Sequence, residues 1–311
     1  MFRKRLQRKR EKNERIGREL AGSAVLQGKS QMREAWDRLR KKPMAMISLG
    51  GIIVIFILAL ACPLFIDYQQ QVVEQDIYNK MAPPSLAHFF GTDYLGRDMF
   101  ARIIWGTRAA VLMGFFANVI TCAVALILAC CCAFFGGIVD LVIMRFVDVL
   151  LSMPSMVLAI AICAGLGNGM WQLIVALSIG NLGNIVQMLR SSTLTIARME
   201  YMEAGKALGA STPYLIIKYM LPNMISTLLI VFTMHVSMNI LMGATLSFVG
   251  LGVKAPTPEW GMILSEGLSY YTVCPRLVNI PGIALIITAF CVTTLGDSLR
   301  DAFDPKLKGK A

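Results

Sequence analysis

Charged side chains are scarce in this sequence. Asp, Glu, Lys and Arg make up 16% of its 311 residues, whereas about a quarter is typical of a soluble domain. Hydrophobic residues account for 56% of the chain, and the mean hydropathy is +0.62. This composition excludes an ordinary soluble globular protein.

The charges that are present leave long uncharged intervals. Five of them contain 24, 31, 41, 35 and 20 residues and cover residues 43–66, 109–139, 149–189, 219–253 and 277–296. About 20 apolar residues of helix cross a bilayer core of about 30 Å, so the 41-residue interval holds two crossings joined by the turn GLGNGM at 165–170. We predict an all-α polytopic membrane protein with six spanning helices, near 44–66, 109–134, 146–164, 171–190, 223–249 and 277–296.

Groups that carry out chemistry are also few. The two histidines, His88 and His235, are far apart, and no serine lies in a nucleophile-elbow pattern. Three of the eight cysteines are consecutive, at Cys130–Cys132, so on a helix they point about 100° apart and cannot converge on one metal ion. Gly22–Ser30 resembles a P-loop, but its glycine spacing is wrong and no strand precedes it. We expect a non-catalytic chain with no metal site and no bound nucleotide or other cofactor of its own.

Lysine and arginine are distributed unevenly. Fifteen of the 30 fall in residues 1–42, and an inside N-terminus places 24 of the 30 on the inner side. Because cytoplasmic loops are enriched in these residues, we expect both termini in the cytoplasm. The basic N-terminal tail is expected to contact anionic lipid, with an interfacial helix at 31–42 carrying Met32, Trp36 and Leu39 on one face. It shows no folded basic face for nucleic acid.

One inner segment, 190–222, interrupts the apolar pattern. Good helix formers run to Leu208, and Gly209 suits the position just after a helix. Thr212 and Pro213 can begin a second helix, which Leu221-Pro222 is expected to end. The physics leaves two readings open: a knob that fits a groove on a cytoplasmic partner, or an amphipathic loop on the membrane.

The same segment resembles a known motif. EAGKALGASTPYLIIKYMLP is similar to the EAA loop of ABC importer permeases, with Glu203, Ala204, Gly209, Leu221 and Pro222 at the motif positions. Gly205 replaces the second Ala of the motif, and Tyr219 replaces the usual Ile. Segments 88–108, 138–160, 244–264 and 296–307 resemble the peptide/nickel branch of that family, and within it the C-type subunit. The similarity runs from about Gln31 to Leu307.

The resemblance implies a type I ABC importer permease fold in a bacterial inner membrane. It implies four kinds of partner: a B-type permease subunit, two cytoplasmic ATPases that bind ATP and Mg, an extracytoplasmic solute-binding protein, and a peptide substrate. Nickel chelates and glutathione are alternative substrates within the family. The ATPase-coupling residues would be Glu203, Ala204, Gly205, Lys206, Ala207, Gly209, Leu221 and Pro222. An ion-coupled carrier is a weaker alternative, since no Asp or Glu lies deep in a predicted span.

Polar residues within spans are candidates for the translocation path. Asn181, Asn184 and Gln187 recur every three residues, and His235 and Asn239 share a helix face that Met242 continues. Hydrogen bonding between helices is the alternative for each.

The chain is thus divided into a basic tail (1–43), a first spanning helix with its outer loop (44–108), a five-helix core (109–296) and a C-terminal tail (297–311). In the outer loop, the turn at 91–98 should lead into an interfacial helix bearing Met99, Phe100, Ile103, Ile104 and Trp105. We expect this region to brace the core, and contact with the binding protein is the alternative.

Overall fold

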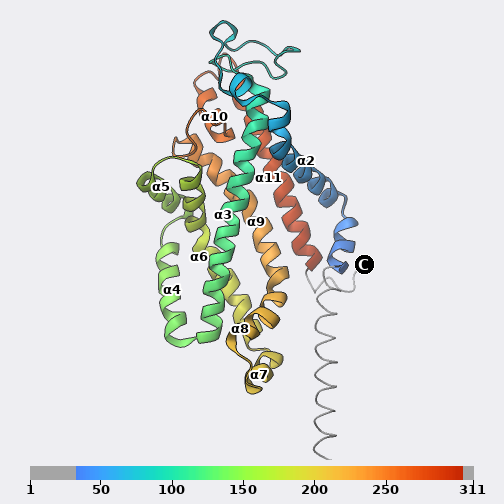
Figure 1. Ribbon diagram of the computed structural model, residues 1–311, viewed down its shortest axis with the longest axis vertical. Coiled ribbons are helices and arrows are strands. Elements are labelled where there is room, and N and C mark those ends of the chain that lie inside the picture. Colours follow the sequence, from blue (N-terminus) through green and yellow to red (C-terminus); the bar gives the residue numbers. More distant parts are fainter. Residues whose placement is uncertain (1–32, 304–311) are drawn as a thin grey trace, which may run out of the picture.

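The computed structural model describes residues 33–303, and the regular structure in that part is helical apart from an isolated bridge between Thr92 and Asp98. Figure 1 shows an elongated bundle with α7 (Glu200–Ala207) at one end and the loops before α3 at the other. We refer to these as the α7 end and the α10 end, after the short helix α10 (Trp260–Leu268) near the second.

The prediction of six spans is confirmed when a bent helix pair counts as one. Five helices are long and apolar enough to cross a membrane by themselves, and one pair bent by 87° passes the same test together. The five are α2 (Pro43–Phe65), α3 (Met99–Phe135), α6 (Met170–Ala197), α9 (Leu221–Phe248) and α11 (Arg276–Phe303), and the bent pair is α4 (Gly137–Leu151) with α5 (Ser155–Leu166).

Small residues bring α3 close to its neighbours. In a bilayer, close backbone approach replaces the hydrophobic effect as the source of helix association. A Cβ on Gly114 of α3 would lie 2.7 Å from Cγ1 of Ile240 on α9, and one on Gly243 would lie 2.9 Å from Sδ of Met113. Further small residues are buried along α3 at Ala110, Ala117, Ala125 and Ala129. The helix α3 is therefore the central element of the bundle.

The third span is not the straight helix predicted at 146–164. Helix α4 ends at Leu151 and α5 begins at Ser155, so the break falls inside the predicted range. Pro154 explains it: proline disfavours helical geometry in the residue before it and has no N–H for the ladder. On α6, a Cβ on Gly183 would lie 3.0 Å from Cγ of Leu151, so glycine lets α4 approach closely.

The predicted start of the second span is also wrong. Helix α3 begins at Met99, not near 109, because the Asp98 carboxylate accepts a hydrogen bond from Ala101 N–H at 2.8 Å and caps it. Met99 and Ile103 are buried inside the chain and do not lie at a membrane interface as expected. The helix therefore begins ten residues before the predicted start of the span at 109.

At the C-terminal side, α11 continues through Phe303, past the predicted end at 296. Contacts with the N-terminal region hold this extension: Arg38 donates to the Ala302 carbonyl, and Lys42 pairs with Asp301 at 2.7 Å. The interfacial helix predicted at 31–42 is present at 33–40, with Leu39 buried and Trp36 43% exposed. These two side chains therefore do not share one buried face, and Met32 lies outside the described residues.

Candidate coupling segment and polar face

The helix α7 projects beyond the ends of α3, α4 and α6 (Figure 1). Two buried side chains anchor the surrounding segment, Met202 on α7 and Leu215 on the short helix α8 (Thr212–Leu215). The opposite face of α7 exposes Glu203, Ala204, Lys206 and Ala207. The segment 200–222, called the coupling segment below, is thus fixed on one side and open on the other.

Gly209 occupies the C′ position predicted for it, directly after Leu208, the C-cap residue of α7. Its φ is +78°, its N–H donates to the Lys206 carbonyl at 3.0 Å, and Ala210 N–H donates to the Gly205 carbonyl at 3.1 Å. These two bonds form a Schellman motif, in which the residue after the helix adopts a left-handed conformation that glycine tolerates best. The turn between α7 and α8 therefore has a defined geometry.

The packing of α8 on α7 accounts for Gly205, which departs from the EAA pattern. A Cβ at this position would lie 2.7 Å from Cδ2 of Leu215. Glycine therefore allows the α8 leucine to sit against the α7 backbone. The sequence alone indicated only that this replacement keeps the surface small.

Leu221-Pro222 does not end the second helix as predicted. The chain stays helical from Thr212 to Phe248 through the π-helical turn η3 (Ile216–Met220). Leu221 N–H donates to the Ile216 carbonyl, five residues back, and Pro222 then lies in the first turn of α9. This wider turn accommodates a residue that has no N–H. The coupling segment is thus joined to a spanning helix without a loop between them.

A polar cleft of about 410 Å³ is lined by α7 and by the adjacent parts of α3, α4 and α6. The Asp140 carboxylate of α4 accepts two hydrogen bonds from the Arg190 guanidinium of α6, at 2.5 and 2.6 Å. Lys206 lies over the Phe134 ring, with its Nζ 5.3 Å from the ring centroid. On α7, burial raises the pKa of the Tyr201 phenol above its ordinary value. The pair Asp140–Arg190 ties α4 to α6 at the level of the coupling segment.

The structure brings two of the five path candidates together. The Asn181 side-chain amide on α6 donates to Oδ1 of the Asn239 side chain at 2.7 Å, and both side chains are buried. In this conformation the pair joins α6 to α9, which is the helix–helix alternative. His235 is half-buried with Nδ1 3.0 Å from the Val231 carbonyl oxygen, and Met242 packs beside a core cluster.

Asn184 has a different environment. It is exposed on α6 and donates to the Ser155 hydroxyl at 3.3 Å, next to the break between α4 and α5, and Gln187 is also exposed. Exposed polar groups inside a span face a cavity or another protein, because hydrocarbon leaves them unsatisfied. Non-helical backbone at membrane depth is tolerated under the same condition. We call Asn184, Gln187 and the break at 152–154 the polar face.

Sequence reasoning missed Asn118. Its side chain is fully buried on α3 and donates to the Phe232 carbonyl of α9 at 2.5 Å. The only sign of it in the sequence was a single Asn within a predicted span, with no second Asn at helical spacing from it.

The α10 end is held by buried charges. Arg97 and Arg102 each pair with both Asp93 and Glu266, at N–O separations of 2.5–3.0 Å. Arg102 is fully buried, and Tyr94 stacks on Tyr270 with ring centroids 5.2 Å apart. The carboxylates raise the pKa of Arg97, although its burial opposes them. These contacts tie the loop before α3 to α10.

Glu259 is the N-cap of α10. One carboxylate oxygen accepts from Met262 N–H at 3.0 Å, while its other oxygen is buried without a partner in the described structure. Burial raises the pKa of this carboxyl above its ordinary value, against the opposing effect of its backbone hydrogen bonds. The group stabilises the start of α10 but is costly to ionise.

Comparison with known proteins identifies the family. Residues 117–309 match the family described as binding-protein-dependent transport system inner membrane component, and residues 30–84 match the N-terminal TM domain of oligopeptide transport permease C. The chain belongs to this permease family. It is therefore a membrane permease subunit of an ABC importer.

Individual relatives agree with this assignment. The chain is 35% identical over 277 residues to the glutathione transport system permease protein GsiD of Escherichia coli O6:K15:H31 (strain 536 / UPEC), which covers 89% of this permease and 91% of that protein. GsiD of Shigella boydii serotype 4 (strain Sb227) matches to the same extent. An inward-facing structure of the MetNI methionine ABC transporter shares the fold, with a TM-score of 0.53 and 20% identity over 66% of this permease and 97% of that chain.

Proposed function

We propose that this permease imports short peptides, with glutathione as the first substrate to test, and that ATP hydrolysis in partner subunits drives the transport. The supporting observation is the coupling segment: the small exposed helix α7 is anchored through Met202 and Leu215, and the helix that follows its turn, α8, is continuous with the spanning helix α9. The GsiD relatives are glutathione permeases by name. Glutathione is a charged peptide, so it needs an aqueous path through the bilayer.

The proposed assembly contains three kinds of protein partner and the peptide substrate. A B-type permease subunit would cover the polar face, two ATPases carrying ATP and Mg would receive the coupling segment, and a solute-binding protein would deliver the peptide at the α10 end. Both termini would lie in the cytoplasm of a bacterial inner membrane, and this chain would have no catalytic role. The 15 basic residues among positions 1–42 support that orientation.

The coupling contact would use Glu203, Ala204, Gly205, Lys206, Ala207 and Gly209, with Leu221 and Pro222 at the junction to α9. Closure of the ATPases would move the segment, and the continuous helix through η3 would carry this motion into α9. Ala204 and Ala207 leave room for a partner surface, and Glu203 and Lys206 offer charges to it. Along the path, we propose Asn184 and the half-buried His235 and Met242 as lining residues, with Asn181 and Asn239 exchanging partners as α9 moves.

Reconstitution tests the proposal. The full complex in proteoliposomes should take up labelled glutathione when ATP is supplied on the side of the ATPases. If excess unlabelled dipeptide reduces this uptake by competition, the permease accepts a broader range of peptide substrates. Tagged permease extracted in mild detergent should bring down ATPase subunits. Uptake that persists without those subunits and follows an ion gradient would refute the proposal and establish a secondary carrier.

A further inference from the structure

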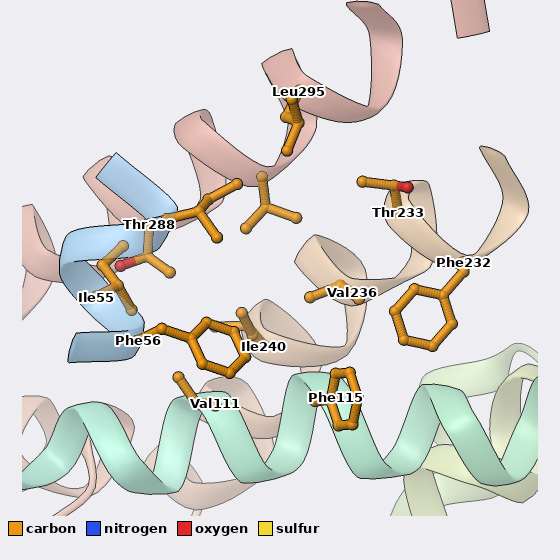
Figure 2. Close-up of a pocket in the computed structure, with 12 residues that line it drawn as sticks. Ile55, Phe56, Val111, Phe115, Phe232, Thr233, Val236, Ile240, Thr288 and Leu295 are labelled. Carbon is orange, nitrogen blue, oxygen red and sulfur yellow. The ribbon is translucent and has the colours of Figure 1, made fainter. Parts of the chain in front are cut away.

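A groove of about 210 Å³ lies among α2, α3, α9 and α11, away from the polar face. Figure 2 shows its lining side chains, which include Phe56, Phe115, Val236 and Leu295. Twelve residues line it, and all are apolar apart from two threonines. The Thr233 hydroxyl already donates to the Leu229 carbonyl at 2.5 Å. A peptide or an ion would find few partners there, so the groove suits a hydrocarbon occupant.

The groove reaches the surface of the chain within the membrane. Phe56 is 41% exposed and Phe115 is 40% exposed, although their rings also contact each other with centroids 6.5 Å apart. All four helices that form the groove are candidate spans. The surroundings of its open side are therefore hydrocarbon or another membrane subunit.

Basic residues lie just before α2, about one leaflet from the groove. Ile52, which lines the groove, comes nine residues after Pro43, the first residue of α2, or about 13.5 Å at 1.5 Å per residue. Arg40 and Lys41 precede this helix, at and directly after the end of the separate helix at 33–40. One leaflet of the hydrocarbon core is about 15 Å thick. Lys41 is exposed, and the Arg40 guanidinium lies over the exposed Trp36 ring, 5.5 Å from its centroid. Exposed basic residues beside an interfacial tryptophan are suited to an anionic headgroup.

We propose that one acyl chain of an anionic phospholipid occupies this groove, with its headgroup against Arg40 and Lys41. This acyl chain would contact both α2 and α9. The lipid would thus connect the peripheral helix α2 with the helix that continues the coupling segment. The combination of an apolar groove and a basic cluster one leaflet away favours a phospholipid over a side chain of another subunit.

Photocrosslinking on the unmodified complex tests the occupant directly. The complex is reconstituted in vesicles of phosphatidylethanolamine and phosphatidylglycerol at 3:1, with a trace of either lipid carrying a diazirine near the end of one chain. Labelled phosphatidylglycerol should mark peptides of α9 and α11 around Val236 and Leu295 at least threefold more than labelled phosphatidylethanolamine does. Three outcomes would overturn the proposal: equal labelling by both lipids, labelling that is spread only over outward-facing residues, or a groove that is filled by a side chain of a partner subunit.

Variants test the two halves of the site by native mass spectrometry of the complex. Val236→Phe should reduce retained phosphatidylglycerol at least twofold by filling the groove. Val54→Phe should not, because Val54 on α2 is 55% exposed and does not line the groove. Arg40→Gln/Lys41→Gln should act like Val236→Phe, and Lys80→Gln/Lys254→Gln at the α10 end is the matched control. Retention unchanged in both test variants would contradict the proposal, and the crosslinking result decides the case if Val236→Phe does not assemble.

Discussion

Gly209 offers a sharp test of the coupling segment, because a side chain added there changes the backbone conformational energy without meeting a neighbouring atom. Its φ is +78°, and a Cβ added there would meet no heavy atom within 4 Å. Gly209→Ala therefore introduces only the cost of placing an L-residue in the left-handed region, about 1–2 kcal/mol. At 1.36 kcal/mol per factor of ten, the population of the native turn relative to other conformers falls by about 5- to 30-fold. We expect a partial loss of ATP-driven uptake.

Gly209→Pro is more severe. Proline fixes φ near −65° and removes the N–H that donates to the Lys206 carbonyl, so the Schellman turn cannot form. We expect uptake and the stimulation of ATPase activity by the binding protein to be abolished. The amount of permease in the membrane and its pairing with the second permease subunit should stay near normal, because the turn lies outside the spans.

Gly250 provides a matched control. It follows α9 with φ +85°, its N–H donates to the Ser247 carbonyl at 3.0 Å, and Leu251 N–H donates to the Leu246 carbonyl at 2.9 Å. The motif is the same, but it lies at the α10 end, so Gly250→Ala should have the same local cost and leave ATPase association intact. Normal uptake by Gly209→Pro would refute the coupling role. Ala204→Trp should also abolish uptake, since it adds bulk to the exposed face without altering the turn.

Other positions test the rest of the molecule. Arg102→Met should lower the free energy of unfolding by about 3–5 kcal/mol, because it removes one of the two guanidinium groups that Asp93 and Glu266 share and leaves Arg97 alone between two carboxylates. Arg145→Met, at the exposed pair with Asp148, should cost under about 1 kcal/mol; thermal unfolding in detergent measures both. A double-mutant cycle of Asn181→Leu and Asn239→Leu should give a coupling energy of about 0.6 kcal/mol, and zero coupling would contradict the observed hydrogen bond. For Glu259, the raised pKa means that the folded state holds its proton more tightly, so this residue's contribution to stability should fall as pH rises from its ordinary pKa of 4.5 through the folded-state value. Glu259→Gln should remove this dependence and be at least as stable at pH 7 in the same unfolding assay.

Much of the architecture could be predicted because it follows from one-dimensional patterns. A span needs an uncharged run of about 20 residues, and such runs are countable. Gly209 could be placed because a helix of good formers that ends in glycine has few alternatives. The break at Pro154 was less predictable, since proline inside a span either kinks or breaks it according to what packs alongside, here Gly183 of α6.

The polar residues show the same limit. Asn181 and Asn184 are three positions apart and identical in type, yet one is buried against Asn239 and the other is exposed beside Ser155. Their periodicity predicted a shared role, but the position of α9 and of the α4–α5 break assigns them different ones. Asn118 went unnoticed because its partner is a backbone carbonyl more than 100 residues away.

The sequence by itself determined that the chain is a multi-span helical membrane protein with a charged, glycine-punctuated insert between two spans, since hydrophobic run length and turn chemistry act locally. Only the tertiary structure decided which face of that insert is open, how Pro222 fits inside a continuous helix, and which asparagines meet. Those outcomes depend on side chains and carbonyls brought together from distant parts of the chain, and the free energy of such contacts has no local pattern in the sequence.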